Sequence, residues 1–139
     1  MMRKNLSLLG LFFITCLVLS DCMAQDLKLE CHGTRKMTTS IGNDIDTHSE
    51  SYEFINGRLN GTYPATWSKD QIKIIYPRQK MADGNSNIIL FERDIIFDRE
   101  LGTVFDFGRV WKPDIPAINN LPNLVMTFNG KCNKSSRKL

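Results

Sequence analysis

The chain has 139 residues, of which 42% are hydrophobic and 24% are charged, and its formal net charge is +3. This length suits one domain with a single core, and the near balance of charges argues against nucleic acid or an anionic membrane as a partner.

The first 24 residues have the three-part layout of a secretory signal. Arg3 and Lys4 give a positive start, an apolar run follows over residues 6–19, and small residues end at Ala24. The apolar run is shorter than the roughly 20 residues that a membrane-spanning helix needs. We therefore predict a cleaved signal peptide over residues 1–24, a periplasmic or secreted product, and no transmembrane segment after cleavage.

A bacterial lipoprotein signal is the minor alternative for the same stretch. In Leu19-Ser20-Asp21-Cys22, the thiol of Cys22 would carry the lipid. The residue before a lipidated cysteine is usually small, and Asp21 is neither small nor neutral. Loss of Arg3, Lys4 and Asp21 with a cleaved signal changes the net charge from +3 to +2.

The rest of the chain alternates apolar and polar residues in short runs, which is typical of antiparallel strands with one wet face. Strands are predicted over residues 27–36, 51–55, 71–76, 88–111 (as a hairpin) and 124–132. The polar stretch 37–50 is interpreted as a loop. Pro64 reduces residues 62–67 to an edge strand or an irregular connection, and Pro77 is expected to end a strand.

Glycine and asparagine mark the turns. Gly102 can take the positive φ that closes the central hairpin, and Asn56-Gly57 and Asn60-Gly61 are strong turn dipeptides. Gly33, inside the first strand, indicates a bulge or a close approach of two backbones. The predicted fold is all-β: a small antiparallel β-sandwich or β-barrel of six to eight strands, with a single domain over residues 25–132 and a basic, flexible tail over 133–139.

The cysteines predict one disulfide. Cys16 leaves with the signal, and Cys22 leaves with it or carries a lipid, so Cys31 and Cys132 remain in an oxidising compartment. Two cysteines without CxxC spacing make a poor zinc site. Because bridged cysteines must lie close together, the first and last strands should pair side by side or face each other across the core.

Three segments together resemble a group of small uncharacterised periplasmic proteins of Gram-negative bacteria. They are the C-x-G start at Cys31, the D-R-x-x-G hairpin at Asp98 and the F-x-G-x-C end at Phe128. The resemblance rests on turn formers, cysteines and strand aromatics. It implies a shared fold and brings no assigned activity.

No set of catalytic residues stands out, and no cofactor is expected. The best metal candidates are Asp44, Asp46 and His48, whose oxygen and imidazole ligands stand at alternate positions, but a polar loop without a metal is the preferred interpretation. His32 is expected on the strand face opposite Cys31, in solvent.

Four carboxylates on the central hairpin could include an acid–base pair. The simpler interpretation is that they lie on the solvent-exposed face of a sheet. They are Glu92, Asp94, Asp98 and Asp106.

Trp67, Trp111 and Lys112 are the candidate partner-binding residues, because tryptophan dominates protein–protein hot spots. At least one of the two tryptophans is expected instead to cap the core of the barrel. The first functional hypothesis is a non-enzymatic binding module, such as an inhibitor or immunity-type protein, that contacts a periplasmic or secreted protein through the loops 112–123 and 43–48. The alternatives are a lipocalin-like carrier of a small molecule and a small metal-dependent enzyme.

Overall fold

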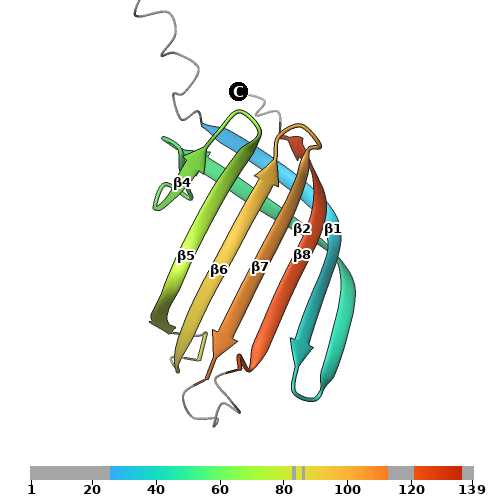
Figure 1. Ribbon diagram of the computed structural model, residues 1–139, viewed down its shortest axis with the longest axis vertical. Helices are drawn as coiled ribbons and strands as arrows, with labels where there is room; N and C mark the ends of the chain where they lie inside the picture. The colour runs from blue at the N-terminus through green and yellow to red at the C-terminus, as the bar shows by residue number, and fades with distance from the viewer. Residues whose placement is uncertain (1–25, 83, 86, 113–120, 136–139) are drawn as a thin grey trace, which may run out of the picture.

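The computed structural model describes residues 26–82, 84–85, 87–112 and 121–135, and its architecture is a closed antiparallel β-barrel of eight strands (Figure 1). Each strand pairs with the next, and the last pairs with the first. The strands are β1 (Leu27–Thr39), β2 (Gly42–Ile55), β3 (Arg58–Leu59), β4 (Tyr63–Trp67), β5 (Gln71–Ala82), β6 (Ile88–Asp98), β7 (Thr103–Trp111) and β8 (Leu124–Lys134). The all-β prediction is confirmed, with a barrel rather than a sandwich. The proposed signal peptide lies outside the described residues, as does most of the loop 112–123.

The barrel closes at a seam between β1 and β8. Cys31 lies directly opposite Cys132 in this antiparallel pair, and the two residues form a disulfide with their Cα atoms 4.0 Å apart. The predicted bridge is confirmed, and it joins strands that lie side by side. β8 runs two residues past Cys132, and the N–H of Ser135 donates to the carbonyl of Lys28, so the start of the predicted tail belongs to the barrel.

Gly33 lies opposite Gly130, where the backbones of β1 and β8 approach each other closely. A Cβ atom at position 33 would lie 1.9 Å from the backbone oxygen of Asn129. The predicted close approach of two backbones is confirmed, and only glycine fits there.

The apolar core fills one end of the barrel, which we call the closed end. Inward side chains alternate along each strand, and among the most deeply buried are Phe54, Ile72, Ile74, Ile95 and Cys31. Aromatic rings meet edge to face within this core, as with Tyr52 and Phe97 at 4.9 Å between centroids. In the described residues this end of the barrel is filled by side chains, as is usual for small barrels.

The predicted turns are confirmed by backbone conformation. Asn56 and Gly57 have φ values of 50° and 73°, and Asn60 and Gly61 have 53° and 69°. These two turns bracket the two-residue strand β3. Gly102 has a φ of 62° in the turn between β6 and β7.

The loop predicted over residues 37–50 is wrong. β1 continues to Thr39, a tight turn follows at Ser40 and Ile41, and β2 begins at Gly42. Both faces of this hairpin carry polar residues, so the apolar alternation that signals a strand is missing although the backbone pairs throughout.

The predicted end of a strand at Pro77 is also wrong. β5 continues to Ala82, and its register with β6 shifts between Tyr76 and Gln79. Pro77 lies in this irregularity, where a missing backbone N–H does not interrupt the ladder.

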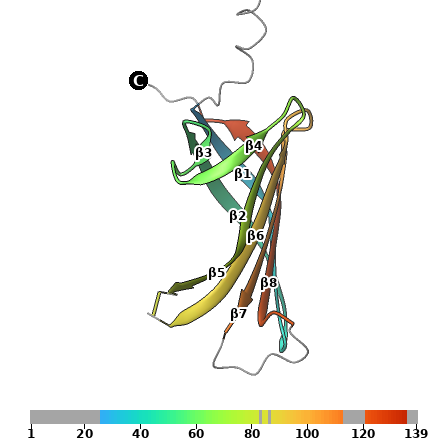
Figure 2. The ribbon, with the colours of Figure 1, turned by 60° about the vertical axis from the view of Figure 1, so that its left-hand side comes forward.

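The strands pair all the way round only at one end of the barrel. Elsewhere the wall has a gap between β2 and β5, because β3 and β4 are short. Only Phe54 and Ile55 of β2 pair with β3, and only residues 72–74 of β5 pair with β4. In the described part of the chain, residues 42–52 of β2 and 75–82 of β5 therefore have no strand on their outer flank; we call this gap the open side. Figure 2 shows β3 and β4 confined to the upper end, with β5 turning away from β2 below them. Across the ranges described, no helix is long and apolar enough to cross a membrane.

Candidate functional site on the concave face

A layer of polar side chains lines the concave face where the apolar core ends and the open side begins. Strand alternation brings it together, because odd residues of β1 and β6 and even residues of β2 and β7 point inward. This polar layer consists of Arg35, Asp46, His48, Glu50, Tyr52, Arg93 and Asp106.

Asp106 is the centre of the buried part of the layer, with its side chain only 7% exposed. Arg93 holds both carboxylate oxygens in a fork: its Nε donates to Oδ1 at 2.8 Å, and its Nη2 donates to Oδ2. The hydroxyl of Tyr52 donates to Oδ2 at 2.7 Å. A bidentate guanidinium and a phenol thus satisfy a carboxylate that would otherwise be costly to bury.

The surroundings raise the pKa values of Tyr52, Arg93 and Tyr76. Burial, reinforced by the negative charge of Asp106, raises the pKa of Tyr52 far above its usual value, so its hydroxyl remains a donor. Burial opposes the charge of Arg93, but the hydrogen bonds and charge of Asp106 outweigh it and raise the Arg93 pKa. Burial also raises the pKa of neighbouring Tyr76 to about 12.

Two more pairs extend the layer along β1 and β2 toward the open side. Arg35 donates to Asp46 through Nε at 3.1 Å and Nη2 at 2.5 Å, and these bonds hold the pKa of Asp46 below its usual value. His48 Nε2 lies 2.9 Å from a carboxylate oxygen of Glu50. The His48 ring also packs edge-on against Phe128, at 5.8 Å between centroids, so its orientation is fixed from two sides.

A cavity of about 200 Å³ lies among these pairs and is bounded by Phe128 and Met126 as well. Each arginine already holds a carboxylate, so the cavity does not offer a free positive charge to an anion. What it offers is a rigid set of hydrogen-bonding groups beside an open strand edge.

The metal candidates Asp44, Asp46 and His48 lie on the inward face of β2 and not in a loop. Asp46 is engaged by Arg35, and His48 by Glu50. Within the ranges that the structure describes, no three His, Cys, Asp or Glu residues are grouped so as to hold a metal ion.

The four hairpin carboxylates are divided between the two faces of the sheet. Glu92, Asp94 and Asp98 alternate onto the convex face, as expected, whereas Asp106 points into the barrel. Glu92 pairs with both Arg78 and Arg109, which gives it a structural role on the outer surface.

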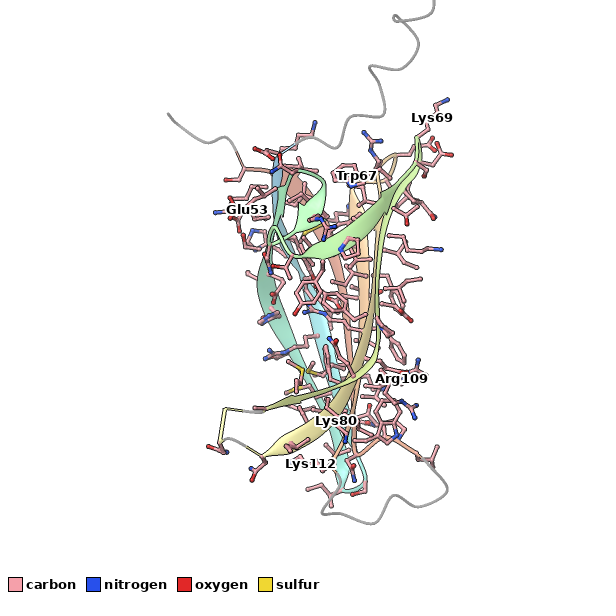
Figure 3. The ribbon with its side chains drawn as sticks, turned by 90° about the vertical axis from the view of Figure 1, so that its left-hand side faces the viewer. Glu53, Trp67, Lys69, Lys80, Arg109 and Lys112 are labelled. Atoms are coloured by element: carbon pink, nitrogen blue, oxygen red, sulfur yellow. A yellow bond between two sulfur atoms is a disulfide. The ribbon has the colours of Figure 1, made fainter. Side chains whose placement is uncertain are left out.

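The tryptophans proposed as partner anchors are not freely exposed. Trp67 packs edge-on against Phe54 at 5.1 Å and donates Nε1 to the carbonyl of Gly57 at 3.1 Å, so it caps the core. Trp111 is only 7% exposed, and the guanidinium of Arg78 lies 3.8 Å above its ring. Lys112 is exposed at the far end of the molecule from Trp67 (Figure 3).

His32 and Ser49 form the one serine–histidine contact in the described residues. They are direct cross-strand partners, with Nδ1 2.7 Å from Oγ, on the exposed outer face. His32 therefore lies in solvent opposite Cys31, as predicted.

Sequence reasoning missed Arg35, Arg93, Tyr52 and Glu50 as members of a site. A signal was present for the arginines, since Arg35 continues the inward series of Cys31 and Gly33, and Arg93 continues that of Ile95 and Phe97. Only the register between strands shows that the two arginines face the same cavity.

Comparison with known proteins gives no match to a family model, to a curated protein or to a solved structure. The resemblance to small periplasmic proteins therefore stays a prediction.

Proposed function

We propose that this chain is an exported, non-enzymatic binding module that takes an extended, basic segment of a partner protein along the free edge of β2. The signal-like layout of residues 1–24 and the single disulfide support export. The single observation that carries the proposal is the open side. Residues 42–52 of β2 pair with β1 on one flank and, among the described residues, with no strand on the other.

A free strand edge presents unpaired backbone donors and acceptors, and adding a strand from another protein satisfies them. The edge is also rigid, since 13 residue pairs tie β1 to β2 from end to end. A partner strand would therefore lose mainly its own conformational freedom on binding.

The charge of β2 defines the chemistry of the partner. Along the free edge, residues 42–52 carry three carboxylates, Asp44, Asp46 and Glu50, and no lysine or arginine. Inward charges on an edge strand deter pairing with apolar strands, which protects against aggregation, and they accept a strand with positive side chains.

Photo-crosslinking tests the proposal. A photoreactive amino acid replaces either Ile45, on β2, or Phe105, on the central strand β7; both side chains are exposed, at 63% and 43%. In oxidised protein comprising residues 25–139, we expect position 45 to capture a partner peptide rich in lysine or arginine from exported proteins of the host. Capture at position 105 alone, or at neither position, would overturn the proposal.

A charge-reversal pair supplies the matched control. Asp44→Lys on β2 should weaken partner binding about tenfold or more, whereas Asp70→Lys, in the exposed turn before β5, should leave it unchanged. Equal effects of the two variants would show that overall charge, and not the edge of β2, governs binding.

A further inference from the structure

A second cavity lies at the closed end of the barrel, away from the open side, and has a volume of about 280 Å³. Its floor is apolar and belongs to the core: Leu29, Ile72 and Phe97 line it and are almost fully buried. We call this cavity the mouth.

Trp67 forms one wall of the mouth and is held in place before any ligand arrives. Its indole N–H is bound to Gly57, and its ring is packed against Phe54. A fixed aromatic wall over an apolar floor suits the hydrocarbon part of a small ligand, because little ordering is needed on binding.

The rim of the mouth is positively charged. Arg99 and Lys134 both border it, and in the part of the chain that the structure describes neither forms an ion pair with a carboxylate. Arg99 is anchored by one bond, from Nη1 to the carbonyl of Ser68 at 2.7 Å, which leaves its other donors available.

Among the described residues that line the mouth, Asp98 is the one acidic residue, and the neighbouring turn already uses its carboxylate. Its Oδ1 accepts hydrogen bonds from the backbone N–H groups of Glu100 at 3.0 Å and Leu101 at 2.8 Å. The two cations are therefore the groups that a ligand would meet at the entrance.

We infer that the mouth binds a small amphipathic anion, with a hydrocarbon chain or ring on the apolar floor and a carboxylate-like head between Arg99 and Lys134. The volume is near the lower limit for small-molecule sites, about 300 Å³, so a medium-chain fatty acid fits better than a large lipid. This site is separate from the edge of β2, and either proposal can fail without the other.

A head-group series tests the inference in a Trp111→Phe background, in which Trp67 is the only tryptophan of residues 25–139. Decanoate, decanol and decylamine are titrated below their micellar concentrations while Trp67 fluorescence is recorded. We expect saturable binding of decanoate, at least tenfold weaker binding of decanol, and none of decylamine. Equal binding of all three, or no change in fluorescence with decanoate, overturns the inference.

Matched charge removals locate the site. The double variant Arg99→Gln and Lys134→Gln should raise the Kd for decanoate about tenfold. The control Lys80→Gln and Lys112→Gln removes the same charge at the opposite end of the molecule and should leave Kd unchanged (Figure 3). Circular dichroism melting verifies that both double variants fold, and an equal loss in the control would place the anion elsewhere.

Discussion

At the scale of single residues, Asp106 depends most strongly on its partners, because its carboxylate is buried inside the barrel. Replacing Asp106 with Asn keeps the volume but leaves the charge of Arg93 uncompensated, and we expect a loss of about 3–5 kcal/mol in the free energy of unfolding. Urea denaturation of the oxidised protein measures it.

The matched variant removes both charges. Arg93→Met combined with Asp106→Leu should be more stable than Asp106→Asn alone, because no unpaired charge stays buried. If Asp106→Asn loses less than about 1 kcal/mol, water reaches the guanidinium and the site is not buried as described.

Tyr76 gives the barrel a sensitivity to alkaline pH. Its pKa is raised to about 12 by burial, whereas an unfolded tyrosine titrates near 10.0. Below pH 10 the phenol is protonated in both states and its contribution to stability is complete. Between pH 10 and 12 the unfolded chain loses this proton first, so stability falls. We expect the unfolding free energy of the wild type to fall more steeply over this window than that of Tyr76→Phe; parallel curves would contradict the assignment.

At the scale of elements, the seam between β1 and β8 depends on glycine. Gly33→Ala would force a Cβ against the backbone of Asn129, and we expect a loss of at least about 2 kcal/mol in urea denaturation. Gly108→Ala is the control, since a Cβ there would meet Met126 at an ordinary 3.5 Å. A similar loss in both variants would mean that strand propensity, and not the close approach, determines the effect.

The sequence predicted the strands with apolar alternation and failed where both faces are polar. Ile, Phe and Val made the strands over residues 88–111 and 124–132 predictable. Only the end of β2, over residues 51–55, was predicted, because residues 42–50 are polar and look like a loop. The polar layer was not predictable as a site, since it depends on which residues of β2, β6 and β7 share a level. Register between strands is a property of the whole barrel.

At the scale of the whole molecule, the disulfide connects residues 101 positions apart. Replacing Cys31 and Cys132 with Ala should lower the unfolding free energy by about 2–5 kcal/mol, mainly because the unfolded chain gains freedom. Alanine is the choice because Cys31 is fully buried and serine would add an unpaired hydroxyl. The oxidised and reduced wild type, compared by urea denaturation, should show a similar difference. A difference below about 0.5 kcal/mol would show that strand pairing alone constrains the ends.

The order of strand pairing has a kinetic consequence. Seven of the eight pairings between described strands join neighbours in the chain, and only the pairing of β1 with β8 joins distant segments. Local contacts form quickly, whereas distant ones must first overcome the entropy of closing a long loop. We therefore expect the neighbouring strands to pair first into an open antiparallel sheet. The pairing of β1 with β8, which closes the barrel, should be the slow step. During synthesis β1 emerges from the ribosome well before β8, so the nascent chain would remain an unclosed sheet until its final strand is made.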